Sequence, residues 1–434
     1  RDATFSGAPT GGSFKVTLPE LRLKALGDGT VEMTMSGEVP ITSTSTSPEG
    51  EVAEMAMKVT QTDLKMLVSG MPADMAYDFS SPVMGVTIES MTVDGTPVPL
   101  TFDIGMTGNS GKYSLKTAGA KELDSTFASE SVTFKVAATD PEGAGNFNMS
   151  GTMAGLSGTS KAMIPEGVDM QDMNAALRAG MLIDGTFTYG GGTYAMDFKD
   201  ATQSMTANVT ATGGGINLKM SQDGMAYGGN GGATQMNVTG SQIPFPVDIS
   251  LAESAFNFVL PVTKSDTPQP FAMLLKIVDL SVSDQIWDMI DPTKQLPRDP
   301  ATVVLDASGQ ATMLIDLMDP ANANSDAMPG QLDAINLNAL QVKAAGAELT
   351  GSGAATVDNS SGMPKPVGAV DLKLVGANAL IDKLVAMGLI PEDQAMGARM
   401  MMGMFAVPSG EDELTSKIEF KEDGGIYANG QRIQ

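Results

Sequence analysis

The dominant pattern along the chain is a two-residue alternation of apolar and polar residues. It appears in short runs at 14–18, 31–35, 100–106, 132–136, 205–211, 216–220 and 418–420. Such alternation places the apolar side chains of a strand on one face and the polar ones on the other. One buried face and one wet face are typical of antiparallel sheets. The pattern therefore predicts strands over most of the chain.

Asp-Gly dipeptides separate many of these runs. They lie at 28–29, 94–95, 184–185, 223–224 and 423–424. Glycine accepts the positive φ of tight hairpin turns at little cost, so Asp-Gly between alternating runs indicates a β-hairpin. These dipeptides predict that neighbouring strands pair directly.

Helices are expected at only a few places. Asp169 can cap a short helix that carries Met170, Met173 and Leu177 on one side. A second short helix is predicted at 283–290, before a proline. The clearest pattern is a helical hairpin, with one helix at 377–387 stopped by Gly388 and a second at 391–405 that begins with a proline.

These elements define the expected architecture. We predict a mainly β fold made of elongated, twisted antiparallel sheet or sheets that curl into a groove or flattened barrel, with a C-terminal helical hairpin at 377–405. A stretch at 151–160 rich in glycine, serine and threonine predicts a boundary. It would divide an N-terminal antiparallel β region, 1–160, from a second β region, 161–434, that holds the short helices and the hairpin.

Composition narrows the function classes. The 434 residues include no cysteine and no histidine, which excludes disulfides, thiolate chemistry and histidine-based catalysis. The net charge of −25 repels nucleic acid, and no apolar run is long enough for a transmembrane segment. A chain that starts at Arg1 and lacks cysteine fits an exported, periplasmic protein whose signal peptide has been removed.

No constellation of residues predicts a specific chemistry. The glycine clusters are not followed by the lysine and hydroxyl residue of a phosphate-binding loop. Pairs of carboxylates can hydrolyse glycosides, but 51 acidic residues make chance pairs unavoidable. We therefore expect no catalytic residues, no cofactor and no metal ligands.

Methionine is the unusual component. There are 33 methionines, and many occupy the apolar phase of the predicted strands. Because methionine is flexible and polarizable, it suits adaptable apolar binding surfaces, although it also fills ordinary cores in place of leucine. As candidate ligand-lining residues we select Met33, Met35, Met55, Met57, Phe102, Met106, Met205, Met220, Met400, Met404 and Phe405.

The C-terminal third contains several recognisable segments. They are Leu-Pro-Arg-Asp-Pro at 296–300, Leu-Ile-Asp-Lys-Leu at 380–384, the glycine at 388 and the closing residues 430–433. Over residues 270–434 the chain resembles an uncharacterised family of alphaproteobacterial exported proteins, a conserved domain of unknown function. This resemblance implies a periplasmic or cell-envelope setting and carries no site residues. The general architecture is similar to periplasmic lipid-handling β-groove proteins, by analogy alone.

Three functions remain open. The leading hypothesis is a non-enzymatic periplasmic protein that binds or carries a lipid or other apolar ligand in a methionine-rich β groove, with an envelope protein as a possible partner. The alternative is an acidic structural or cell-surface protein that acts through protein–protein contacts and is stabilised by calcium. The third is a carbohydrate-active enzyme, which needs two carboxylates and aromatic residues in a polar cleft.

Overall fold

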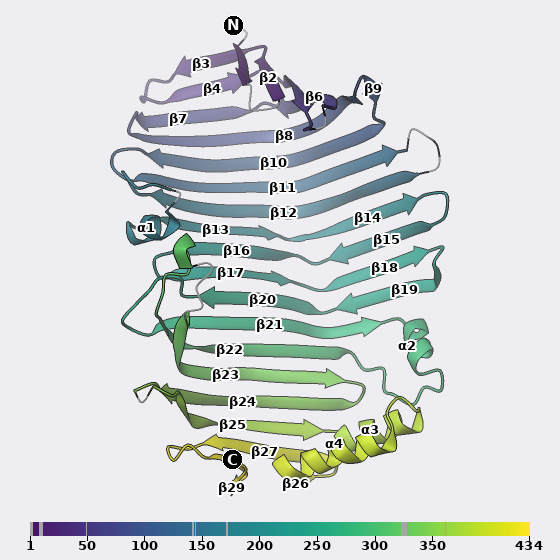
Figure 1. The fold of residues 1–434 in the computed structure, drawn as a ribbon. Coiled ribbons are helices and arrows are strands. Elements are labelled where there is room, and N and C mark those ends of the chain that lie inside the picture. The colour runs from purple at the N-terminus through teal and green to yellow at the C-terminus, as the bar shows by residue number, and fades with distance from the viewer. Residues whose placement is uncertain are drawn as a thin grey trace. The chain divides into compact units, whose positions relative to one another are not determined.

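The computed structural model describes residues 3–7, 12–48, 50–140, 143, 145–170, 172–322, 328–360 and 362–434. Its chain is 65% strand and 10% helix, the strands pair antiparallel, and two helices form a hairpin near the C-terminus (Figure 1). The predicted fold class is confirmed. Contacts divide the chain into two units, which we describe separately: unit 1 comprises 1–166, 183–215 and 235–246, and unit 2 comprises 167–182, 216–234 and 247–434.

Unit 1 is built from strands alone in the part that the structure describes. Its order of pairing is β1–β2–β5–β6–β8–β10–β11–β12–β14–β15, and a branch β3–β4–β7 joins the first half of β8. The bounds are β1 Ala3–Gly7, β2 Gly12–Leu18, β3 Leu21–Ala25, β4 Val31–Met35, β5 Glu38–Thr46, β6 Val52–Thr62, β7 Lys65–Met71, β8 Asp74–Val93, β9 Thr96–Pro97, β10 Leu100–Lys116, β11 Lys121–Thr139, β12 Asn146–Ile164, β13 Leu182–Tyr189, β14 Gly191–Lys199, β15 Ser204–Ala211 and β18 Thr234–Gly240. Strand β19, Ile243–Leu251, begins in unit 1 and continues into unit 2 from Val247 onward.

The long strands of unit 1 share one line of bends, which we call the crease (Figure 1). In β10 the apolar positions are even-numbered up to Met106 and odd-numbered from Gly111 onward, and β11 changes parity between Phe127 and Val132. The apolar positions of β10 pair with those of β11 on both sides of the crease: Met106 pairs with Val132, and Gly111 with Phe127. Because a β-bulge adds one residue to a strand, the change of parity keeps the apolar side chains on one face. Gly108, with φ of 61°, supplies the extra residue in β10.

At the crease, where backbone hydrogen bonds between strands are interrupted, buried polar side chains form hydrogen bonds with backbone carbonyl oxygens. The Ser81 hydroxyl lies 3.1 Å from the carbonyl oxygen of Thr62 and 2.9 Å from that of Val83. The Asn109 amide donates to the carbonyl oxygen of Ser81 at 3.2 Å, and the Ser129 hydroxyl lies 3.0 Å from that of Thr107. Unpaired backbone groups are costly when buried, so these residues stabilise the bend.

Phenylalanine rings lie over cross-strand glycines on the apolar side of unit 1. Phe79 pairs with Gly111, Phe127 with Gly158, and Phe134 with Gly151. A Cβ at any of these three glycines would lie within 2.7 Å of the ring of its partner. The ring therefore occupies the space that a side chain would fill at the glycine, and it shields the glycine backbone from solvent.

Unit 2 combines a sheet with the helices. Its sheet runs β17–β20–β21–β22–β23–β24–β25–β27, with β26, β28 and β29 at its end. The strand bounds are β16 Gly214–Ser221, β17 Gly224–Gly231, β20 Glu253–Leu260, β21 Gln269–Val282, β22 Ala301–Met313, β23 Gly330–Ala344, β24 Ala347–Asp358, β25 Lys365–Val375, β26 Val407–Gly410, β27 Glu413–Phe420, β28 Ile426–Ala428 and β29 Gln431–Arg432. The helices are α1 Met173–Arg178, α2 Asp284–Ile290, the 3-10 helix η1 Pro320–Asn322, α3 Ala377–Ala386 and α4 Glu392–Phe405.

Most sequence-based predictions of local structure agree with these bounds, and two are wrong. Asp172, not Asp169, caps α1, because its carboxylate accepts a hydrogen bond from the backbone N–H of Ala175 at 2.9 Å. The Asp184-Gly185 dipeptide lies inside β13 and makes no turn. The stretch at 151–160 lies within β12, so its glycines serve sheet packing and the crease at that position.

A small buried core of unit 2 forms around α1. Ala176, Leu177, Met181 and Val262 pack together. Beside them Asp316 accepts hydrogen bonds from the Arg178 guanidinium at 2.6 Å and from the backbone N–H of Lys264 at 2.7 Å. Burial acts to raise the pKa of Asp316, but these donors outweigh it and hold the pKa below its usual value.

Acid is expected to weaken unit 2 through Asp316. Since the pKa is lower in the folded state, the stabilisation is present above about pH 4 and is lost as pH falls through the folded-state pKa. Urea unfolding between about pH 6 and pH 3 should therefore depend less steeply on pH in Asp316→Asn than in the wild type. Gln222→Asn, an uncharged exchange at an exposed turn, is the control and should leave the slope unchanged. Equal slopes for Asp316→Asn and the wild type would contradict the assignment.

The residues that carry the family resemblance at 296–300 hold α2 in place. Asp291 is fully buried, and its carboxylate accepts a hydrogen bond from the backbone N–H of Leu296 at 2.6 Å. Burial acts to raise the pKa of Asp291, but the N–H groups of Gln295 and Leu296 lower it below the usual value. Arg298 forms ion pairs with Asp284 and Asp288 of α2. This motif is therefore structural.

The helical hairpin is fixed from both ends. Asp412 accepts hydrogen bonds at the start of α3 from the backbone N–H groups of Asn378 at 3.1 Å and Ala379 at 2.9 Å. At the end of α4, the carbonyl oxygen of Phe405 accepts hydrogen bonds from the Ser416 hydroxyl and the Asn429 amide. Arg399 of α4 forms an ion pair with Asp382 of α3. The hairpin is therefore anchored to the sheet.

Replacing Asp412 with alanine should loosen the start of α3. The substitution removes a side chain that acts as an N-cap from outside the helix, and such a loss costs about 1 kcal/mol. Urea unfolding should show this decrease in the free energy of unfolding. The neighbouring exposed substitution Glu411→Ala should leave that free energy within error of the wild type, and an equal effect from both would contradict the capping role.

Candidate functional site

The sheet of unit 2 has one apolar face. Tyr227 pairs with Phe258, Phe258 with Met273, and further along Val303 pairs with Val342. Directly paired residues and alternate residues of a strand point to the same side. One row crosses eight strands through Tyr227, Phe258, Met273, Ala307, Leu337, Gly353, Val370 and Ile418. Seven spacings of about 4.8 Å make this row about 34 Å long.

Much of this face remains in contact with solvent. Seven large apolar side chains on it are between 36% and 44% exposed: Tyr227, Phe258, Met273, Leu275, Val303, Ile335 and Val342. Isolated exposed hydrophobics are ordinary, but a contiguous patch marks a binding surface. We name these seven residues the apolar patch of unit 2.

Unit 1 also carries its apolar residues on one side of each strand. Ile104 pairs with Phe134, and Phe134 lies across from Gly151. The rings of Phe134 and Tyr194 have centroids 6.1 Å apart, so neighbouring strands contribute to one surface. Most of these side chains are half-buried, and the described part of unit 1 provides no helix to cover them.

The structure brings seven of the candidate ligand-lining residues into unit 1. Five lie on the same side of the crease, in β6, β10 and β15, and two lie in β4. All seven are half-buried; they are Met55, Met57, Phe102, Met106 and Met205, with Met33 and Met35 in β4. Met106 pairs with Met84 and Val132, and Met33 pairs with Met66.

The remaining four candidates lie in unit 2 and do not form one group. Met220 packs against the buried core around α1. Met400, Met404 and Phe405 belong to α4, where both methionines are exposed and Phe405 is half-buried. The eleven candidates therefore belong to three separate environments.

Sequence reasoning missed the apolar patch of unit 2. The alternation of Phe271, Met273, Leu275 and Ile277 was a readable signal, because it is the same two-residue pattern used elsewhere. That pattern cannot distinguish a covered face from an open one. Only the exposure of these side chains singles them out.

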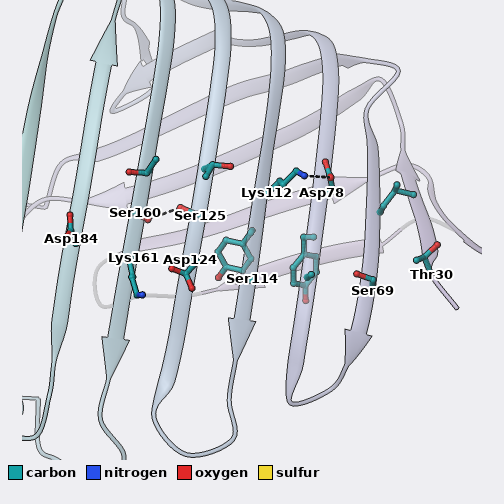
Figure 2. A pocket seen from close by; sticks show the side chains of 16 residues that line it. Thr30, Ser69, Asp78, Lys112, Ser114, Asp124, Ser125, Ser160, Lys161 and Asp184 are labelled. Atoms are coloured by element: carbon teal, nitrogen blue, oxygen red, sulfur yellow. Dashed lines mark hydrogen bonds and ion pairs between the residues drawn. The ribbon is translucent and has the colours of Figure 1, made fainter. Parts of the chain in front are cut away.

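The opposite, polar side of unit 1 carries a hollow of about 770 Å³ that spans β7, β8, β10, β11, β12 and β13 (Figure 2). Lys112 forms an ion pair with Asp78 at 3.6 Å, and Asp124 lies directly across from Lys161. Ser125 and Ser160 also line the hollow, although they share the strand phase of Phe127 and Gly158, and their hydroxyls are 2.7 Å apart. Most of the charged and hydroxyl side chains around the hollow are exposed, an arrangement that solvates one face of a sheet.

The displaced pKa values of the described carboxyls all lie in one direction. Every described carboxyl whose pKa is displaced has a lowered pKa; at Asp200 the backbone N–H of Thr202 and the Thr202 hydroxyl lower it to about 2. A glycosidase acid needs the opposite displacement. Among the described residues no group of three or more acidic side chains is placed to hold a metal ion. We also find no helix, within the described ranges, with the length and apolar content needed to cross a bilayer.

These features define the chain as an antiparallel β protein whose sheets carry apolar faces that are incompletely covered. It belongs to the family described as "Uncharacterized protein conserved in bacteria (DUF2125)", whose model matches residues 198–433. The match begins well upstream of the resemblance seen in the sequence and includes the apolar patch and the helical hairpin. The family description names no activity.

Two further comparisons give no indication of function. The comparison with curated proteins gave no match. Among solved structures, the chain is similar to the crystal structure of BauA, the ferric preacinetobactin receptor from Acinetobacter baumannii, at 7% sequence identity. The alignment covers 98% of this chain and 76% of that chain, with a TM-score of 0.23. That score is too low to indicate a shared fold.

Proposed function

We propose that this chain is a non-enzymatic protein of the bacterial periplasm that binds or carries a lipid, with the acyl chains lying along its open apolar sheet faces. The observation that carries the proposal is the apolar patch of unit 2, in which seven large side chains remain 36–44% exposed on one continuous surface. A face of this kind gains free energy when a ligand removes it from water.

The shape of the face favours a long, thin ligand. Its row of about 34 Å runs across the strands and is interrupted only by small residues such as Ala307 and Gly353. Small residues between large ones produce shallow troughs, in which an extended hydrocarbon chain makes more contacts than a compact ligand does. Flexible methionine side chains such as Met273 adapt to chains that differ in length and unsaturation.

The chemistry of the patch selects hydrocarbon over polar ligands. None of its seven residues carries a charge, and only Tyr227 has a polar group. A headgroup would remain outside the patch, where the abundant acidic residues of the chain disfavour further negative charge. We therefore expect the acyl chain to supply the affinity and, among lipids with equal chains, neutral or zwitterionic headgroups to be favoured over anionic ones. A fatty acid still binds, because its single carboxylate stays in solvent outside the patch.

Retained lipid is the direct test. Protein purified from a Gram-negative periplasm without detergent should show, by native mass spectrometry, masses that exceed the chain by those of phospholipids or fatty acids. After delipidation it should bind a fluorescent long-chain fatty acid saturably, with increased emission of the probe. Absence of both retained lipid and saturable binding would overturn the proposal.

The same experiment addresses the alternative of protein–protein contact. If the apolar patch serves a partner or a second copy, native mass spectrometry should show oligomers or a bound protein and no lipid, and the probe should not bind. This alternative uses the same exposed patch, so the bound species decides between the two.

A further inference from the structure

Helix α4 presents a second apolar surface, separate from the sheet. Met396, Met400 and Met404 are 60–67% exposed and lie four residues apart, so that they form one stripe along three turns. Met401, 59% exposed, lies beside it. We name these four residues the methionine stripe. Solvent contact of this extent is unusual for large apolar side chains that lie together.

The stripe is exposed although the helix is held firmly. Ala395 on the opposite side of α4 is only 1% exposed, and Arg399 forms an ion pair with Asp382 of α3. The carbonyl oxygen of Phe405, at the end of the helix, accepts hydrogen bonds from Ser416 and Asn429. The helix therefore faces solvent in a fixed orientation.

The charges around the stripe favour an electrically neutral partner. The acidic residues of α4, Glu392 and Asp393, lie at its first turn, and its one basic residue, Arg399, is already ion-paired. The stripe itself has no charge, and the whole chain carries −25. An anionic surface would be repelled by this net charge and by the two first-turn carboxylates, of which Glu392 lies four residues before Met396, in line with the stripe. The paired Arg399 leaves α4 with no free basic side chain to attract an anionic partner.

Resting on the proposed function, we propose that the methionine stripe docks α4 in the surface of a zwitterionic lipid bilayer. A helix of 14 residues is too short to span a bilayer but can lie in its interface with the apolar side chains inserted. Flexible thioether side chains suit the irregular acyl surface. Ser416, which binds the end of α4, pairs with Leu372 in the apolar rows of the sheet, so a docked stripe brings one end of that face to the membrane.

Vesicle flotation of the full chain tests this proposal. The wild type should float with phosphatidylcholine vesicles, and less with vesicles rich in phosphatidylglycerol. The triple variant Met396→Ser, Met400→Ser, Met404→Ser should reduce partition into phosphatidylcholine vesicles by at least about tenfold. The matched control replaces three scattered methionines of 67–71% exposure, Met71, Met289 and Met328, with serine, and it should float like the wild type.

The two proposals can fail separately. Wild-type protein that binds the fluorescent fatty acid but does not float would overturn docking and leave lipid binding in place. Protein that floats through the stripe but neither retains lipid nor binds the fatty acid would support docking and overturn the proposed function. Equal flotation of wild type and stripe variant would overturn docking, as would loss of flotation in the control. If wild-type protein captures a protein partner through the stripe and does not float, the stripe is a protein interface and docking is overturned.

Discussion

Replacing Gly158 with valine is expected to destabilise unit 1 by about 2 kcal/mol, because added volume that displaces a packed neighbouring side chain has costs of this size. Gly158 lies directly across from Phe127, and a Cβ at position 158 would lie 2.2 Å from the ring. The carbonyl oxygen of Thr186, 3.0 Å away, closes the other side. The Phe127 ring must therefore move, and it would lose its contact with Phe187, whose ring centroid is 6.2 Å away.

Urea unfolding followed by circular dichroism measures this effect, with Gly185→Val as the control. Gly185 lies in the neighbouring strand β13, but its nearest neighbour to an added Cβ is 3.8 Å away. The control should remain close to wild-type stability. Adding Phe127→Ala to Gly158→Val should recover part of the loss, since the two positions share one space. If Gly158→Val and Gly185→Val behave alike, the ring-over-glycine packing is not what constrains this position.

Placing carboxylates on the apolar patch should reduce affinity for a long-chain fatty acid by at least about tenfold, because an acyl chain would then desolvate a charge. We choose the double variant Leu275→Glu, Val342→Glu. Both side chains are more than 40% exposed, so their replacement should alter the free energy of unfolding far less than it alters binding. The affinity is measured by titration of delipidated protein with the fluorescent fatty acid.

The matched control places a carboxylate on the other face of the same sheet. Ala354 is exposed and pairs with Asn336 on the polar side of β24. Ala354→Glu adds negative charge to unit 2 without touching the apolar patch, and it should bind the fatty acid like the wild type. Undiminished binding by the double variant would place the ligand elsewhere; loss of binding in both variants would indicate a general charge effect.

The candidate site was only partly accessible to sequence reasoning. Methionine periodicity led to Met55, Met57 and Met106, which the structure places on one side of unit 1. It could not lead to Leu275 or Val342, because residues of the same pattern are covered in one protein and open in another. Met220 shows the limit most clearly: its strand phase matched the other candidates, but α1 and its core pack against it.

The crease was likewise only partly predictable from the sequence. The change of parity between Met106 and Gly111 can be read in the sequence, as can the one between Phe127 and Val132. That these shifts align across neighbouring strands depends on pairings between residues distant in the sequence, such as Met106 with Val132. The wrong prediction of a turn at Asp184 has the same cause. The local preference of Asp-Gly for a turn is overridden where the backbone pairs with a neighbouring strand.

The amino-acid sequence by itself determined the local periodicities: strands with one apolar face, a helical hairpin near the C-terminus, and the exclusion of cysteine and histidine chemistry. These follow from residue types and their spacing, which act over a few residues. The tertiary structure alone decided which apolar faces remain open, that α4 presents its methionines outward, and that the bends form one line. Those properties depend on what packs against each face, and packing joins segments that the sequence separates by tens to hundreds of residues.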